Sequence, residues 1–251
     1  MQIYFIFFLF TLFFNASLIC NVSSEVEKWL LPKDHPLQEN LVKIFNREPK
    51  SYFDAMLMIK LGFETIKRTS NKKACIVARH SALKGFVFKF YKNAKNKINT
   101  LELLLSRING AEKIKNAIHE NQCESFFIVP KKWLWKPPQK TKKKHLPEYI
   151  LIAEEINILN RKKNMQAWSG RHSNIFLVAV YTILNKIGLY DSVYIDNIPF
   201  TKDGKVAFVD TEHYHNWPVD FAKLLNQLSP EMQVKWQEII LNGTIPYTSI
   251  E

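Results

Sequence analysis

The hydrophobic positions between residues 100 and 120 repeat with the period of an α-helix. Apolar side chains recur at spacings of three and four residues, with Asn99 or Thr100 as the helix cap. A second apolar stretch, residues 175–187, ends at Gly188, a common helix stop. These patterns predict two long helices, and weaker patterns predict shorter ones over 37–45, 51–59, 219–228 and 232–241.

Strands are predicted mainly before residue 155. Residues 74–78 and 85–91 are rich in β-branched and aromatic side chains and are joined by a short connection, so they predict an antiparallel pair. Alternation in the second strand places three phenylalanines on one face and Lys89 on the other. Further apolar strands are predicted at 126–129 and 149–153.

This order of elements predicts an α+β fold. Strands crowd residues 50–155 around one main helix and helices dominate residues 156–251, so we expect a small antiparallel-sheet lobe followed by a reduced helical lobe. With 251 residues, 47% of them hydrophobic, the chain is long enough to bury a sizeable core. We expect the two lobes to form a single domain over residues 23–251.

The stretch from Asn197 to Glu212 has the most informative arrangement of polar positions. Asp203-Gly204 is a strong signal for a two-residue hairpin turn, and residues 206–209 form an apolar run short enough for a buried strand. A buried strand that ends at Asp210 carries carboxylates from a dry interior to a cleft. Asn197 and Asp210, with Glu212 beside them, offer the oxygen ligands that a divalent cation prefers.

Two histidines follow these carboxylates. A transition-metal site would use them, but alternation along an extended chain points His213 and His215 away from Asp210 and Glu212. The alternative role for Asp210 is to cap a helix near Trp217. The pattern therefore favours a cation bound through oxygen over a transition metal.

Charge is distributed unevenly along the chain. The formal net charge is +12, yet the first 20 residues contain no charged side chain. Residues 3–14 are an apolar run that is short for a membrane span, which needs roughly 20 residues, but that fits the core of a secretory signal. We therefore expect residues 1–22 to be a signal peptide and the protein to be exported (secreted or periplasmic). It would be membrane-anchored if the segment stays uncleaved.

Cys75 and Cys123 remain beyond the signal. Export permits a disulfide between them, and two buried free thiols are the favoured alternative.

Positive charge is densest from Lys131 to Lys144, where seven lysines stand with Trp133 and Trp135. A solvated loop is the expected structure. Cations beside stacking rings also suit single-stranded nucleic acid or an anionic membrane surface. The segment is a candidate docking arm for an acidic partner, with nucleic acid as a less favoured one.

The strands and the long helix resemble the sheet lobe of the protein-kinase-like fold. Val87-Phe88-Lys89 resembles the strand whose lysine binds nucleotide phosphates. Glu112 on the next helix stands where that lysine's glutamate partner is expected, with Glu102 as the alternative. Residues 150–155 resemble the hinge strand, which implies that the backbone at Glu154 contacts an adenine ring.

The hairpin completes the resemblance. Asn197 and Asp210 are similar to the catalytic-loop asparagine and the Mg²⁺-binding aspartate of the family. The family's base lies five residues before the asparagine, which is Ser192 here, so the resemblance implies Asp191, one residue earlier, as the base. Asp196 is the less favoured base, and a second alignment lets it replace the asparagine instead.

The resemblance implies an exported, atypical kinase-like protein that binds ATP or another nucleotide with Mg²⁺ or Mn²⁺. It would transfer phosphate to an unknown protein or small-molecule acceptor and act as a monomer. Because the sequence lacks a Gly-x-Gly-x-x-Gly loop and a His-Arg-Asp motif, an inactive secreted interaction module is an alternative. A basic protein that binds nucleic acid or an anionic surface through residues 131–144 is the third hypothesis.

Overall fold

The computed structural model describes residues 24–46, 55–68, 75–91, 100–138 and 148–243. The predicted signal peptide and the last part of the lysine-rich segment, residues 139–144, lie outside these ranges. The chain divides into two compact units, each built from separate stretches of sequence. Unit 1 comprises residues 1–83, 88–96 and 133–152, and unit 2 comprises residues 84–87, 97–132 and 153–251.

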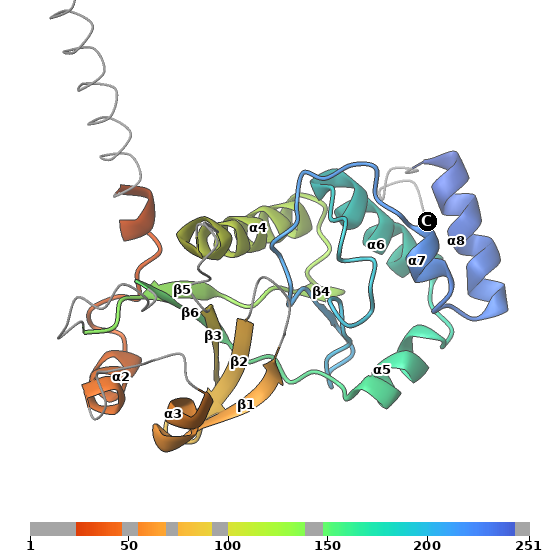
Figure 1. The fold of residues 1–251 in the computed structure, drawn as a ribbon. Coiled ribbons are helices and arrows are strands. Elements are labelled where there is room, and N and C mark those ends of the chain that lie inside the picture. Colours follow the sequence, from red (N-terminus) through yellow and green to blue (C-terminus); the bar gives the residue numbers. More distant parts are fainter. Residues whose placement is uncertain (1–23, 47–54, 69–74, 92–99, 139–147, 244–251) are drawn as a thin grey trace, which may run out of the picture. The chain divides into compact units, whose positions relative to one another are not determined.

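A five-stranded sheet with the order β1-β2-β3-β6-β5 supplies most of unit 1 (Figure 1). Its strands are β1 (Phe63–Arg68), β2 (Cys75–His80), β3 (Phe86–Tyr91), β5 (Lys132–Trp135) and β6 (Ile150–Glu154), and helices α2 (Leu37–Asn46) and α3 (Ala55–Lys60) accompany them. Strands β1 and β2 pair antiparallel, as do β2 and β3, where Lys89 is the partner of Val77. The predicted antiparallel pair is therefore confirmed.

Aromatic rings fill the core of unit 1. Phe88 and Phe90 are buried on either side of the half-buried Lys89, as the alternation predicted. The ring of Phe63 lies 5.4 Å from each of these two phenylalanine rings and 5.7 Å from that of Phe45. The strand that contains Phe63, β1, was not predicted, because most of its other residues are polar and the side chains of residues 64–66 are exposed.

Unit 2 is mainly helical. Its elements are α4 (Thr100–Glu120), β4 (Phe127–Ile128), α5 (Arg161–Trp168), α6 (Asn174–Ile187), β7 (Val206–Ala207), α7 (Ala222–Leu225) and α8 (Pro230–Asn242). Helix α4 has the predicted bounds, and its apolar stripe is buried. In α6 the Ser173 side chain caps the first turn, and Gly188 ends the helix with a left-handed backbone (φ 65°). Helices α6, α7 and α8 lie together in Figure 1.

The predicted hairpin forms in unit 2. Phe200 pairs with Val206, and the Thr201 N–H donates to the Lys205 carbonyl at 2.7 Å. Gly204 adopts the positive φ of 87° that a tight hairpin turn requires. The second arm, β7, also pairs in parallel with β4. This pairing buries the arm at the centre of the unit and so explains its apolar run.

The start of the lysine-rich segment is a strand and not the solvated loop that we expected. Trp133 and Trp135 are buried in unit 1, where Trp135 donates its indole N–H to Gln38 at 3.0 Å and packs on Phe45. Lys132 is also buried, within unit 2. The two indole rings are therefore not exposed for stacking on bases.

The α+β class is confirmed by a sheet-rich unit and a helical unit. Cys75 and Cys123 are free and buried, as the favoured alternative predicted. Burial, with a smaller effect of nearby Glu124, raises the pKa of the Cys123 thiol to about 11. In the ranges described above, no helix is both long enough and apolar enough to cross a membrane.

Candidate functional site

The hairpin brings Asn197 and Asp210 to the same end of unit 2. The Val209 N–H donates to the Asn197 carbonyl at 3.2 Å, and the Ala207 N–H donates to the Pro199 carbonyl at 2.9 Å. The two arms are therefore held together up to the residue before Asp210. Because the turn closes the opposite end, Asn197 and Asp210 lie at the open end, as the sequence pattern predicted.

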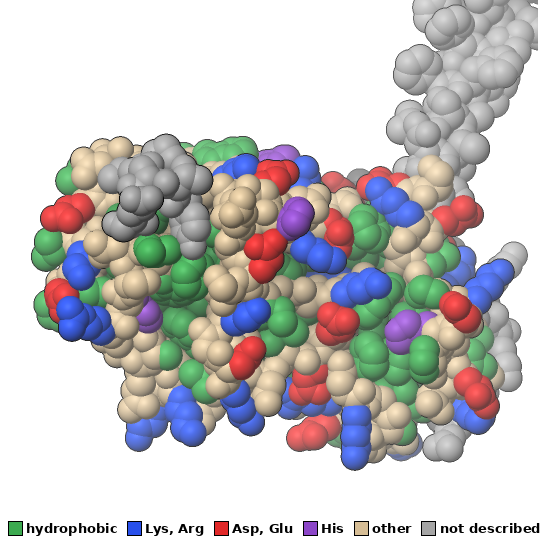
Figure 2. Space-filling view, turned by 180° about the vertical axis from the view of Figure 1, so that it is seen from behind, with side chains coloured by type: hydrophobic (Ala, Val, Ile, Leu, Met, Phe, Trp, Pro, Cys, Tyr) green, Lys and Arg blue, Asp and Glu red, His purple; other side chains and the backbone are tan. Residues whose placement is uncertain are grey.

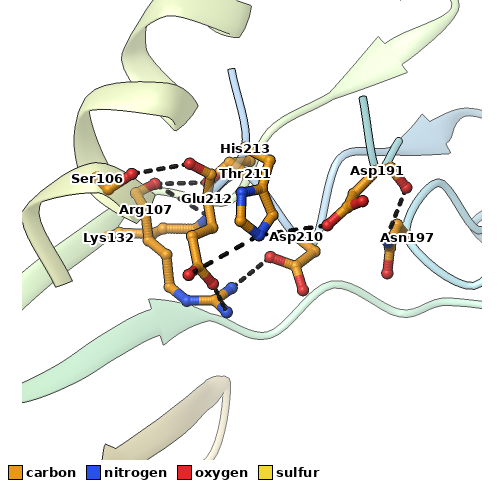
Figure 3. Close-up of polar contacts among 9 residues, drawn as sticks. All are labelled: Ser106, Arg107, Lys132, Asp191, Asn197, Asp210, Thr211, Glu212 and His213. Atoms are coloured by element: carbon orange, nitrogen blue, oxygen red, sulfur yellow. Dashed lines mark hydrogen bonds and ion pairs between the residues drawn. The ribbon is translucent and has the colours of Figure 1, made fainter. Parts of the chain in front are cut away.

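A side-chain hydrogen bond links Asn197 to Asp191. The amide nitrogen of Asn197 donates to the Asp191 carbonyl at 2.7 Å, so the amide oxygen is directed to the other side (Figure 3). Ser192, at the family's base position, is buried, whereas the side chain of Asp191, the favoured candidate, is 35% exposed. Asp196 is exposed. The geometry therefore favours Asp191 over Ser192 as a group that can meet a ligand.

Arg107 extends from α4 and joins Asp210 to Glu212 (Figure 3). Its Nη1 donates to Asp210 Oδ1, and its Nη2 donates to Glu212 Oε2 at 2.5 Å. The side chains of Arg107 and Glu212 are 9% and 6% exposed, while that of Asp210 is 36% exposed. Because a buried carboxylate needs a compensating charge, the guanidinium explains how Glu212 is accommodated here.

Close contacts fix α4 on the segment that bears these carboxylates. The Ser106 hydroxyl donates to the Glu212 carbonyl at 2.8 Å, and the Thr211 hydroxyl donates to the Arg107 carbonyl at 2.5 Å. A Cβ on Gly110 would lie only 1.9 Å from the Thr211 carbonyl oxygen. Glycine at this position therefore allows the backbone approach that brings Arg107 to its partners.

Lys132 adds a second buried cation. Its Nζ donates to the Thr211 hydroxyl at 2.6 Å and to the Arg107 carbonyl at 3.5 Å. Two cations and the two carboxylates of Asp210 and Glu212 thus share one connected network. Sequence reasoning missed both cations, because Lys132 stands in a run of lysines. For Arg107 a signal was present: it lies on the apolar stripe of α4, between the buried Leu104 and Ala111.

His213 lies against two acidic side chains, contrary to the sequence expectation. Its Nε2 is 3.3 Å from Asp191 Oδ2 and 3.9 Å from Glu212 Oε1. The alternation argument was wrong because β7 ends at Ala207, so the chain around His213 is not a strand. His215 has a positive φ of 54° and stacks on Trp217 instead, with ring centroids 5.6 Å apart.

The other predicted residues lie elsewhere in the two units. Lys89 is half-buried on β3 in unit 1, and each unit is described by itself, so its role at the phosphates stays a prediction. Glu112 is half-buried on α4 in unit 2. The Glu154 carboxylate accepts from the Lys131 N–H at 2.9 Å, and its backbone N–H donates to the Lys131 carbonyl. Unit 2 thus brings together Asp191, Asn197, Asp210 and Glu212.

Comparison with known proteins adds little to this geometry. No protein-family model and no curated protein sequence matches the chain. Among solved structures, it is similar to a MAP kinase, LmaMPK10, from Leishmania major, with 12% sequence identity and a TM-score of 0.32. The match covers 76% of this chain and 70% of that one. A likeness at this level does not establish a family.

Proposed function

We propose that unit 2 carries a nucleotide-dependent phosphotransferase site of the kinase-like kind. The observation that supports it most is the convergence of Asn197 and Asp210 at the open end of one hairpin, with Asp191 bonded to Asn197. Phosphoryl transfer of this kind needs a base that accepts the acceptor's proton and oxygen ligands for a divalent cation. These three residues have the required chemistry.

Asn197 and Asp210 fit Mg²⁺ or Mn²⁺, because both present oxygen ligands and Asp210 is partly exposed. Among the residues described, no group of three or more His, Cys, Asp and Glu side chains is arranged to hold a metal ion. The amide oxygen of Asn197 and the nucleotide phosphates would therefore complete the ligand set. When bound, the cation neutralises charge on the phosphates. We assign Glu212 to holding Arg107.

Asp191 would act as the base. Its carboxylate is partly exposed, His213 contacts it, and Asn197 holds its backbone. In the proposed reaction the acceptor's hydroxyl oxygen bonds to the γ-phosphorus while the bond to the β–γ bridging oxygen breaks. ADP leaves, and the hydroxyl proton passes to the Asp191 carboxylate. The acceptor is an alcohol on a protein or a small molecule.

A catalytically inactive kinase-like interaction module is the second candidate. The observation that favours it is the ion pair between Arg107 and Asp210, which already supplies a positive charge to the proposed metal ligand. An inactive relative would keep this ion pair as part of its scaffold and transfer no phosphate.

Nucleic-acid binding through residues 131–144 has less support. The expected stacking rings, Trp133 and Trp135, are buried. On the face shown in Figure 2, lysine and arginine side chains are interspersed with aspartate and glutamate and do not form one basic patch.

Thermal shift with ATP and Mg²⁺ or Mn²⁺ tests the proposal. We expect nucleotide with metal to stabilise the wild type, and Asp210→Ala to lose the shift. Asp203→Asn is the matched control, since it changes an aspartate at the closed end of the same hairpin and keeps a turn-forming residue. No shift in the wild type would contradict nucleotide binding. Turnover of labelled ATP then separates the enzyme from the inactive module.

We also propose that the protein is exported, on the basis of the apolar run at residues 3–14. N-terminal sequencing of the mature protein should show a start near residue 23. A chain that retains residues 1–22 would support a membrane anchor or no export.

A further inference from the structure

The guanidinium of Arg107 occupies the position between two carboxylates that lie close enough to share a cation. Its two terminal nitrogens donate to different residues, Asp210 and Glu212. The side chains of Arg107 and Glu212 are each less than a tenth exposed. Glu212 is therefore held inside, whereas Asp210 is also accessible from the side of the solvent.

The positive charge of Arg107 is permanent, because a guanidinium stays protonated in proteins. The backbone that carries it is fixed as well: the Arg107 carbonyl accepts from Thr211 and Lys132. Gly110, one turn later, packs directly on the Thr211 carbonyl. Arg107 is thus a built-in part of the site and not a mobile surface side chain.

This geometry sets the electrostatics that a divalent cation would meet. Protein kinases hold Mg²⁺ through an aspartate and an asparagine, the two residues that Asp210 and Asn197 resemble. Here a fixed cation already contacts both carboxylates, and it would repel a dication that approaches Glu212. Asn197 and the exposed side of Asp210 offer a position for one ion on the hairpin side.

We propose that Arg107 limits this site to one divalent cation and keeps Glu212 from binding metal. Arg107 is then a residue that determines metal stoichiometry, and the inference rests on the proposed function in taking Asp210 as a metal ligand. Because the guanidinium weakens binding of the cation alone, metal and nucleotide should bind together.

Titration of the full chain with Mn²⁺, with free Mn²⁺ followed by electron paramagnetic resonance, tests this inference. We expect the wild type to bind at most one Mn²⁺, and more tightly with ATP present. Arg107→Gln should bind Mn²⁺ at least about tenfold more tightly without ATP, since one nearby positive charge is removed. The double variant Arg107→Gln/Glu212→Gln should lose this gain, because Glu212 supplies it.

A second readout uses stability. Removal of the guanidinium leaves Asp210 and Glu212 without their shared cation, so Mn²⁺ should raise the melting temperature of Arg107→Gln more than that of the wild type. Should Arg107→Gln fail to fold, Glu212→Gln in the wild-type background still decides the question. The inference requires that this variant bind Mn²⁺ as the wild type does.

Two results would overturn the inference: equal Mn²⁺ binding by the wild type and a folded Arg107→Gln, or weaker Mn²⁺ binding by Glu212→Gln. Failure of the proposed function gives a different result. In that case the wild type binds neither Mn²⁺ nor ATP. Arg107→Gln could still gain Mn²⁺ binding, and if this gain required Glu212, it would show that Arg107 prevents metal binding.

Discussion

Unit 2 contains two contacts between basic and acidic side chains, one of them buried and the other exposed. Arg107 pairs with Asp210 and Glu212 where two of the three side chains are almost fully buried. Asp191 pairs with His213 where both side chains are more than a third exposed. Burial makes the first contact a structural requirement, since any one of its charges alone would be costly. Because the second contact is exposed, its loss should cost the fold little.

This difference in burial separates the roles of Asp210 and Asp191, which lie in the same site. Glu212 lies next to both contacts, since its carboxylate binds Arg107 and stands 3.9 Å from His213. The buried contact fixes the position of Asp210, whereas the exposed contact leaves the Asp191 carboxylate accessible to solvent. Variants that affect only one contact test this division.

Arg107→Met should have the largest effect on stability. Loss of one partner from a buried ion pair costs about 3–5 kcal/mol, and urea denaturation measures it. Lys186→Met is the control, because it breaks an exposed ion pair with Glu120 (2.8 Å) and should change stability by less than about 1 kcal/mol. Similar losses in the two variants would show that burial does not distinguish them.

Gly110→Ala should reduce stability by about 1–3 kcal/mol, the usual cost of overpacking. Helix propensity alone predicts the opposite sign, a gain of about 1 kcal/mol. The close approach of Thr211 should outweigh that gain, because the added Cβ would meet its carbonyl oxygen at 1.9 Å. The exposed Asn116→Ala in the same helix controls for propensity. Stabilisation of Gly110→Ala would show that α4 shifts without cost.

Asp191→Asn should change stability by less than about 1 kcal/mol, because its contact with His213 is exposed. If Asp191 is the base, the same variant should lower phosphate transfer by about 10²–10⁴-fold. Denaturation and turnover of labelled ATP, measured on one preparation, separate the two effects. A large loss of stability would place Asp191 with the structural residues.

His172 gives the test with the smallest expected effect, because it is a half-buried histidine with no carboxylate among its described contacts. Burial, opposed in part by a hydrogen bond to the Trp168 carbonyl, lowers the pKa of His172 below 6.5. As pH falls, His172 is therefore protonated in the unfolded chain before it is protonated in the folded chain. The free energy of unfolding should then decrease as pH drops below about 6.5. The fall should end at the folded pKa. In His172→Phe this part of the pH dependence should be absent, which denaturation at pH 5 and pH 8 can show.

The sequence predicted those parts of the fold that depend only on interactions between residues close together along the chain. The stripe of α4, the end of α6 at Gly188 and the hairpin turn at Asp203-Gly204 each need only neighbouring residues. The Asn197 and Asp210 positions followed from that turn. Burial of Trp133 and the parallel pairing of β7 with β4 depend on distant segments, which a single sequence does not reveal.

The site was predicted in part for the same reason. Its acidic residues could be found because they end an apolar run. Arg107 is 103 positions away from its partner Asp210, and Lys132 is 79 positions away from its partner Thr211. Only the fold makes these residues neighbours.

The close approach of Gly110 to the Thr211 carbonyl has a consequence for the search for homologues of this chain. Arg107-x-x-Gly110 and Asp210-x-Glu212 form one physical unit, although about a hundred residues separate them. In diverged homologues, loss of the glycine should accompany loss of the arginine or of the paired acids. Joint presence of the two short patterns would then be a more selective search criterion than either pattern alone.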